Sequence, residues 1–232
     1  VQAREKPDTA TLIGKGKVAE LAEMCEAMDV DTVIFNEELS GVQLRNLEEA
    51  TGVRVIDRTI LILDIFADRA ASKEGKLQVE LAQLQYRMPR LTGFGKSLSR
   101  LGGGIGTRGP GEKKLETDRR HITRRIDDIR EELRKAEKSR QLQRAGREKS
   151  RLPVVALVGY TNSGKSAIMN RLLSMADNEE KTVASKDMLF ATLDTQHRRI
   201  TLEQGNEFIL IDTVGFVSKL PHGLVEAFKS TL

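Results

Sequence analysis

The chain has 232 residues, of which 38 are Lys or Arg and 34 are Asp or Glu, for a formal net charge of +4. A single Cys excludes a disulfide framework and a cysteine-built zinc site, and it fits a reducing compartment. The absence of Trp and a 4% aromatic content argue against a stacking platform for single-stranded nucleic acid, and no apolar run approaches the ~18 residues of a membrane span.

Positive charge and glycine are both concentrated in the middle of the chain. Residues 1–91 carry a formal charge of −4, residues 92–151 carry +9 and residues 152–232 carry −1. Eight of the 19 glycines fall within Thr92–Glu112. Because composition changes at both edges of this middle part, we expect three structural parts. Their predicted bounds are 1–72, 73–150 and 151–232.

Strand and helix patterns alternate in the first part. β-branched runs that predict strands lie at 10–13, 32–35 and 53–56. An apolar stripe over Val18–Met28 predicts one helix, and Ser40 with Gln43 forms the capping-box start of another. This order predicts a small parallel sheet with crossover helices, partly covered by the apolar stretch 60–66. The glycines of Gly14–Lys17 are weak evidence for a second nucleotide site.

Two helical seams flank the glycine-rich stretch. Before it, apolar residues recur at spacings of four and three, at Leu77, Leu81, Leu84, Met88 and Leu91. After it, the same spacing returns at Ile122, Ile126, Ile129, Leu133 and Ala136. Such heptad seams predict two helices that pack on each other. The economical arrangement is an antiparallel helical hairpin with a long tip loop at 92–112.

The tip loop combines glycine with positive charge. A structureless loop of this length is uncommon in a compact domain and is usually functional or disordered. Glycines permit close backbone approach, and cations suit phosphates. Contact with an RNA backbone is one interpretation and a merely mobile tip is the other, and neither specifies a base sequence. The candidate RNA-binding residues of the tip and the following helix are Lys96, Arg100, Arg108, Arg119, Arg120 and Arg124.

The third part opens with a nucleotide-binding motif. The apolar run 152–158 predicts a strand, which leads into Gly159–Ser166, with the pattern G-x-x-x-x-G-K-S, and then into a helical stretch. In this context loop amides and the helix N-terminus surround phosphates, Lys165 reaches the β- and γ-phosphates, and Ser166 binds Mg²⁺. The candidate nucleotide-binding residues of this motif are Gly159, Tyr160, Thr161, Asn162, Ser163, Gly164, Lys165, Ser166 and Ala167.

A second motif follows the apolar strand at 208–211. Its residues, all candidate nucleotide contacts, are Asp212, Thr213, Val214 and Gly215. Asp212 is the expected carboxylate for Mg²⁺, and the Gly215 N–H is placed to sense the γ-phosphate. Between the motifs, Thr192 lies where a switch segment is expected, and the order of the three elements favours a phosphate and Mg²⁺ ligand over a turn residue. The candidate catalytic residues are Lys165, Thr192 and Gly215, and the candidate metal ligands are Ser166, Thr192 and Asp212.

Two residues near these motifs bear on catalysis. Phe216 stands where many P-loop GTPases have a water-orienting Gln, and a phenyl ring cannot orient or polarise water. Catalysis must then use backbone groups, another side chain or a partner, so we expect slow hydrolysis by the isolated chain. Asn162 has two interpretations: it helps to bind K⁺, as in cation-dependent GTPases, or it shapes the loop by hydrogen bonding.

These motifs resemble one known family. LGGGIGTRGPGEKKLETDRR at 101–120, followed by GYTNSGKS, LFATLD and DTVGF, is similar to the HflX family of ribosome-associated GTPases, of the Obg-HflX superfamily. EGKLQVELAQL at 74–84 and DTVIFNEELSGVQLRNLEEATGVRVIDRT at 31–59 resemble it as well. The resemblance implies a cytoplasmic GTPase that uses GTP with Mg²⁺, binds the large ribosomal subunit and splits or rescues stalled ribosomes. It also implies a hairpin tip directed toward the peptidyl transferase region, and ATP binding by the N-terminal domain in some members.

Two departures from the family pattern matter. Ala167 stands where the family usually has Thr, although Ser166 keeps the metal ligand. The guanine-reading N/T-K-x-D motif does not occur up to Leu232, and the visible strands of the nucleotide domain are few, near 152–158, 197–203 and 207–212. We therefore expect a family member truncated at both ends, in which 151–232 is the N-terminal half of a P-loop GTPase domain.

The resulting hypothesis is an α/β protein with a small parallel α/β N-terminal domain, a long antiparallel helical hairpin with a glycine-rich tip, and a partial P-loop GTPase domain. We expect a monomeric, cytoplasmic GTPase that binds guanine nucleotide and contacts large-subunit ribosomal RNA through residues 92–125. The rival interpretations are a non-enzymatic ribosomal RNA-binding fragment and a P-loop ATPase. The preference for guanine rests on the resemblance alone.

Overall fold

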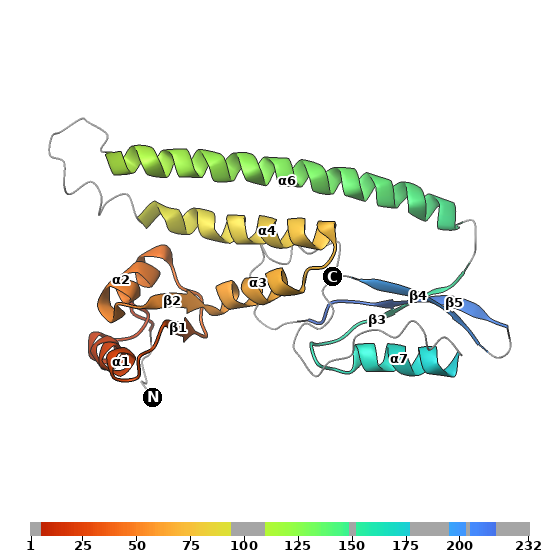
Figure 1. Cartoon of the computed structure of the whole chain (residues 1–232), viewed down its shortest axis with the longest axis horizontal. Coiled ribbons are helices and arrows are strands. Elements are labelled where there is room, and N and C mark those ends of the chain that lie inside the picture. Colours follow the sequence, from red (N-terminus) through yellow and green to blue (C-terminus); the bar gives the residue numbers. More distant parts are fainter. Residues whose placement is uncertain (1–5, 94–109, 149–151, 177–194, 203–204, 217–232) are drawn as a thin grey trace. The chain divides into compact units, whose positions relative to one another are not determined.

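Parallel pairing of two short strands forms the first layer of the fold. The structure is a computed structural model that describes residues 6–93, 110–148, 152–176, 195–202 and 205–216. In it, β1 (Thr32–Phe35) pairs in parallel with β2 (Arg54–Asp57). Helix α1 (Lys15–Ala27) precedes β1, and α2 (Gly41–Thr51) connects the two strands (Figure 1). The prediction of a small parallel α/β domain is confirmed.

The core of this domain lies between the strands and the two helices. Its fully or nearly fully buried side chains are Val18, Leu39, Leu47 and Val55. Partly buried apolar side chains of Leu12, Ile13, Val33, Phe35 and Leu44 pack against them. The helical stripe and the β-branched runs of the sequence therefore supply the same core, as expected for a crossover unit.

The predicted strand at 10–13 is wrong. Asp8 and Leu12 exchange two main-chain hydrogen bonds of 2.9 Å across a turn, and Leu12 has a φ of 64°. The Asp8 carboxylate accepts hydrogen bonds from the N–H groups of Ala10 and Thr11 at 2.9 and 3.3 Å. A short acidic side chain thus offers the backbone a local alternative to extended pairing, which outweighs the β-propensity of the run.

The start of α2 is set by the predicted capping box. The N–H of Gln43 donates to Ser40 Oγ at 3.3 Å, and the N–H of Ser40 donates to Gln43 Oε1 at 2.9 Å. Two otherwise orphan N–H groups of the helix end are satisfied in this way. Gln43 Nε2 also donates to the carbonyl oxygen of Asp8 at 2.9 Å, which joins the α2 N-terminus to the preceding turn.

The middle region is helical. It consists of α3 (Arg58–Arg69), α4 (Lys73–Arg87), the 3₁₀ helix η1 (Met88–Gly93) and α6 (Pro110–Glu148). Leu77 and Leu81 of the first predicted seam are buried, and so are Ile126 and Ile129 of the second. The first seam is shorter than predicted, because Met88 and Leu91 lie in η1. Pro89 disfavours the α conformation of the residue before it, which accounts for the end of α4 at Arg87.

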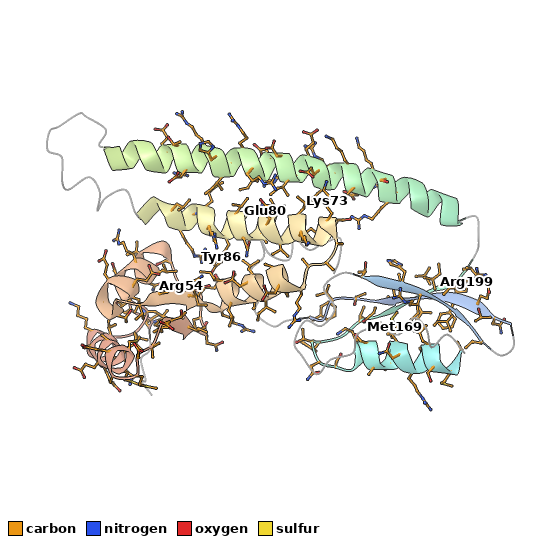
Figure 2. The ribbon with its side chains drawn as sticks, in the orientation of Figure 1. Arg54, Lys73, Glu80, Tyr86, Met169 and Arg199 are labelled. Atoms are coloured by element: carbon orange, nitrogen blue, oxygen red, sulfur yellow. The ribbon has the colours of Figure 1, made fainter. Side chains whose placement is uncertain are left out.

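Ion pairs join the start of α4 to the second half of α6. Lys73 Nζ lies 3.1 Å from Glu132 Oε2, and Arg140 Nη2 lies 2.5 Å from Glu74 Oε1. Figure 2 shows Lys73 and Tyr86 at opposite ends of α4. In an antiparallel hairpin, residues at the start of the first helix lie beside residues near the end of the second, as these pairs do. The tip loop itself, predicted at 92–112, lies mostly outside the described residues.

A second sheet contains the nucleotide motifs. Its strands are β3 (Val154–Leu157), β4 (Gln196–Thr201) and β5 (Glu207–Asp212), in the order β3-β5-β4. β5 pairs in parallel with β3 and antiparallel with β4. Helix α7 (Lys165–Met175) packs Met169 and Leu173 against Ile200 and Leu210, all of them fully or almost fully buried. Met169 is labelled on α7 in Figure 2. The three strands predicted for this part of the chain are confirmed.

The chain divides into two compact units. One contains residues 1–63 and 83–126, and the other contains 64–82 and 127–232. Helices α3, α4 and α6 each contribute residues to both units. The division into parts at 1–72, 73–150 and 151–232 stays a prediction. Within the described ranges, every helix is either too short or too polar to cross a bilayer.

Replacing Ser40 by Ala should lower the free energy of unfolding by about 1 kcal/mol, because the Gln43 N–H loses its acceptor. Ser139→Ala, on the exposed surface of α6, is the matched control and should be neutral or slightly stabilising. Chemical denaturation followed by circular dichroism compares the two. Equal stability of both variants would show that the capping box contributes nothing.

Candidate functional site

Sheet register brings the two nucleotide motifs to one edge. In the parallel pair, Val154 lies opposite Ile209 and Leu157 lies opposite Asp212. The loop Gly159–Gly164 begins just after Leu157, and Asp212 ends β5. Because the carboxyl ends of parallel strands meet at the same edge, residues 46 positions apart become neighbours at the N-terminus of α7.

A hydrogen bond joins the first motif to the second. Ser166 Oγ donates to Asp212 Oδ2 at 2.6 Å, and the Asp212 side chain is fully buried. Thr213 Oγ1 donates to the carbonyl oxygen of Leu157 at 2.7 Å, which fixes the chain immediately after Asp212. A hydroxyl and a carboxylate so close together are the hard oxygen donors that Mg²⁺ prefers. Two of the three predicted metal ligands thus fit the ion, and the third, Thr192, lies outside the described residues.

Lys165 occupies the first turn of α7 and points back over the loop. Its Nζ donates to the carbonyl oxygen of Tyr160 at 2.8 Å and to that of Gly159 at 3.3 Å. Burial lowers the pKa of the Lys165 ammonium, and the charge of Asp212 opposes this shift. The ammonium thus lies against the loop at the N-terminus of α7, and a lysine and a helix N-terminus both favour anionic oxygens.

The end of the second motif is attached to the loop by main-chain hydrogen bonds. The Phe216 N–H donates to the Gly159 carbonyl at 2.9 Å, and the Thr161 N–H donates to the Phe216 carbonyl at 3.1 Å. A Cβ built on Gly215 would lie 2.6 Å from Thr161 Cα, so no larger residue fits without a shift of backbone. The predicted phosphate sensor Gly215 therefore lies directly against the loop.

Sequence reasoning missed this attachment. The rings of Tyr160 and Phe216 meet edge to face, with centroids 6.4 Å apart and planes at 81°. Phe216 was expected only to leave the attacking water without a side-chain partner. A parallel bridge joins Tyr160, three residues past the end of β3, to Phe216, four residues past the end of β5. The bridge is therefore shifted by one residue from the β3–β5 register, and no spacing in the sequence signals it.

Two residues of the loop, Asn162 and Gly164, have left-handed backbone conformations. Asn162 has a φ of 59°, a conformation that Asn adopts more readily than most residues with side chains. Its side chain is exposed, and so is that of Ala167 in the first turn of α7. The two interpretations of Asn162, as a K⁺ ligand and as a loop-shaping residue, stay predictions.

The candidate RNA-binding residues are only partly described. Arg119, Arg120 and Arg124 are exposed on α6. Arg120 Nη2 pairs with Glu116 Oε1 at 2.7 Å, an exposed pair of the kind that contributes little stability and exchanges readily. Helical periodicity places Arg120 and Arg124 away from the buried side of α6, which is marked by Ile126 and Ile129. Lys96, Arg100 and Arg108 lie outside the described residues.

Three family models match successive parts of the chain. They are described as GTP-binding GTPase N-terminal, over residues 1–67; GTP-binding GTPase Middle Region, over residues 69–147; and 50S ribosome-binding GTPase, over residues 154–232.

Curated relatives match over the whole of this chain. "GTPase HflX" of Caldanaerobacter subterraneus subsp. tengcongensis is 59% identical over 231 residues, which are 100% of this chain and 53% of the relative. "GTPase HflX" of Lacrimispora saccharolytica is 52% identical over 232 residues, again 100% of this chain and 53% of the relative. A solved structure described as the SsGBP and GDP complex has a TM-score of 0.51 and 26% identity, over 99% of this chain and 58% of that one.

The chain spans about half the length of the curated relatives it matches. The matches run in the same order as the parts of the fold, from the small α/β domain through the helical region to the loop that joins Ser166 to Asp212. On these grounds the chain belongs to the HflX family of GTPases.

Proposed function

We propose that this chain belongs to a ribosome-associated GTPase, which binds the large ribosomal subunit and couples GTP binding and hydrolysis to the splitting or rescue of stalled ribosomes. The observation that carries the proposal is the 2.6 Å hydrogen bond between Ser166 and Asp212, at the edge where the phosphate loop and the second motif meet. The match of residues 154–232 to a 50S ribosome-binding GTPase supports the same function. A ribosomal partner also supports a cytoplasmic location.

The nucleotide is held mainly by charge and by backbone amides. Lys165, now on the Tyr160 and Gly159 carbonyls, turns to the β- and γ-phosphates, while the first turn of α7 donates N–H groups to them. Ser166 and Asp212, together with Thr192 of the switch segment, are the residues that would hold Mg²⁺. When bound, this ion would neutralise charge that develops on the phosphate oxygens.

The γ-phosphate is sensed through the second motif. The Gly215 N–H is the donor that we assign to it, because Gly215 lies against Thr161 in the phosphate loop. Phe216 supplies no side-chain group to the attacking water. Ordering of that water therefore depends on backbone groups, on Thr192 or on the ribosome, which makes hydrolysis by the isolated chain slow.

Lys165→Ala should weaken GTP binding about a hundredfold or more, because the only side-chain cation assigned to the phosphates is lost. Arg171→Ala removes an exposed positive charge from the same helix and should leave binding unchanged. Titration with a fluorescent GTP analogue in Mg²⁺ measures both variants. Large-subunit affinity should stay largely intact in Lys165→Ala, and a loss of both affinities would argue against separable modules.

Hydrolysis should be about tenfold faster in K⁺ than in Na⁺ if Asn162 helps to hold a cation between the phosphates. The Asn162→Ala variant should lose this difference while still binding GTP. Turnover is measured with large subunits present, at matched ionic strength. Equal rates of the unsubstituted chain in the two salts would leave Asn162 with the loop-shaping role.

RNA contact is assigned to the glycine-rich tip of a helical hairpin and to the start of α6. The exposed Arg119, Arg120 and Arg124 continue the positive charge of Lys96, Arg100 and Arg108 along the chain. Guanidinium groups that pair with phosphates release counterions, so such binding depends steeply on salt. The ion pairs of Lys73 with Glu132 and of Arg140 with Glu74 support the hairpin arrangement, because they join an early residue of α4 to a late one of α6.

Reversing two charges, in Arg108→Glu with Arg120→Glu, should weaken large-subunit binding and flatten its dependence on salt by about one unit of slope for each lost phosphate contact. Arg134→Glu with Lys138→Glu makes the same change in net charge farther along α6, at exposed positions, and should cost much less affinity. Sedimentation with purified subunits at several salt concentrations tests both. Unchanged binding by the first variant would remove the assigned surface.

The same assays separate the proposed function from its two rivals. Large-subunit binding without turnover of any nucleotide, by a chain that spans half of its relatives' length, favours the RNA-binding fragment. A preference for ATP over GTP in the turnover assay favours the P-loop ATPase.

A further inference from the structure

A buried carboxylate outside the nucleotide motifs, that of Asp57, has four partners. Asp57 ends β2 and is fully buried. Its Oδ2 accepts hydrogen bonds from the Leu39 N–H at 3.1 Å and from the Tyr86 hydroxyl at 2.5 Å, and its Oδ1 accepts one from the Ile60 N–H at 2.9 Å. Arg90 Nη2 lies 3.7 Å from Oδ2. Burial of a charge is costly unless such partners surround it, so this cluster restricts the geometry of everything it contacts.

Two of these partners come from the end of α4 and from η1. Burial raises the pKa of Tyr86, and the hydrogen bond to Asp57 raises it further, so the phenol stays protonated and remains a donor. The Arg90 guanidinium stacks on the Tyr86 ring at 3.4 Å from its centroid. Arg90 also donates from Nε to the Leu39 carbonyl at 3.1 Å and from Nη1 to the Tyr86 carbonyl at 2.8 Å.

The backbone of η1 is packed as closely as its side chains. A Cβ built on Gly41, the first residue of α2, would lie 2.8 Å from the Arg90 carbonyl oxygen and 3.0 Å from Arg90 Cα. Glycine is therefore required there, since any side chain would push η1 off the helix. The N–H of Ser40, the neighbouring residue, is already bonded within the capping box, so α2 presents a fixed end to η1.

We infer that Asp57 is a positioning residue for RNA binding, acting through Tyr86 and Arg90. The three side chains hold Met88–Gly93 on the N-terminal domain, and the chain enters the glycine-rich segment from this anchored position. This anchoring fixes residues 88–93, from which the glycine-rich segment continues, in the unbound protein. The entropic cost of ordering the chain on ribosome binding is therefore smaller. The inference rests on the proposed contact of residues 92–125 with large-subunit RNA.

An ion-paired cluster suits this role better than it suits stabilisation. Buried charge pairs are often no more stabilising than apolar side chains of similar volume, but their hydrogen bonds fix direction and register. In this cluster Arg90 donates hydrogen bonds to the Leu39 and Tyr86 carbonyls and also pairs with the Asp57 carboxylate. An apolar contact could bury the same surface while leaving η1 free to rotate or slide.

The test uses the full chain with conservative changes. Tyr86→Phe keeps the ring under Arg90 and removes only the hydroxyl, and Arg90→Gln removes the guanidinium. Arg87→Gln, an exposed arginine at the end of the same helix, controls for loss of one positive charge. Each variant is measured for thermal unfolding, for hydrogen exchange of residues 88–93 against residues 41–51, and for large-subunit affinity at several salt concentrations.

We expect Tyr86→Phe and Arg90→Gln each to lower large-subunit affinity about tenfold, with faster exchange in residues 88–93 only. Both variants should stay folded at the assay temperature and keep the salt slope of the unsubstituted chain, since neither residue contacts phosphate. The double variant should lose little more than either single one, because both act through Asp57. Arg87→Gln should bind as the unsubstituted chain does.

Three outcomes would overturn the inference. Unchanged affinity of both variants, while Arg108→Glu with Arg120→Glu still weakens binding, removes the positioning role and leaves the proposed function in place. A lower salt slope in Arg90→Gln makes Arg90 a direct phosphate contact instead. If the unsubstituted chain does not bind large subunits at all, the proposed function fails and the inference fails with it.

Discussion

Main-chain pairing of β3 with β5 is the interaction on which the nucleotide site depends. The pairing register fixes Asp212 opposite Leu157, and every later contact of the site follows from that placement. Ser166 reaches Asp212 because α7 starts one loop after β3, and Phe216 reaches Gly159 because the chain continues past β5 in the direction of the phosphate loop. A slip of one residue would turn Asp212 to the other face of the sheet and separate the donors. The apolar packing of Met169 and Leu173 on Ile200 and Leu210 is what holds this register against slippage.

Charged residues are distributed unevenly between the N-terminal part and the middle of the chain. Residues 1–91 are negative overall and residues 92–151 are strongly positive. Charge is therefore distributed unevenly along the chain, although the net charge is only +4. Some acidic side chains of α4 and α6 form ion pairs within the helical region, as Glu132 does with Lys73 and Glu74 with Arg140. Within residues 92–151 the excess of cations lies mainly in 92–125, which have 9 Lys or Arg and 3 Asp or Glu, against 9 and 6 in 126–151. Such an arrangement would orient the protein during its approach to a polyanion, before any specific contact forms.

Much of the fold followed from local patterns, and the exceptions have identifiable causes. The strands at 32–35 and 207–212, the capping box at Ser40 and the phosphate-loop motif were all readable, because each rests on a short stretch of chain with its own chemistry. The strand predicted at 10–13 failed where the Asp8 carboxylate bonded to its neighbours, and the helical seam ended early at Pro89. The cluster around Asp57 and the attachment of Phe216 could not be predicted from the sequence. Both join residues far apart in sequence, and no spacing rule connects them until the topology is known.

The main chain and the side chain of Phe216 make different contacts with the phosphate loop. The N–H and the carbonyl of residue 216 hold the second motif on the phosphate loop, whereas the side chain is 43% exposed and its ring meets that of Tyr160 edge to face. Any residue with a free N–H would preserve the bridge, and proline alone would break it. The main-chain attachment thus requires only a residue with an N–H group at this position. Under the proposed function, the scaffold that holds Gly215 on the phosphate loop is therefore independent of the side chain that stands where other P-loop GTPases have a water-orienting Gln.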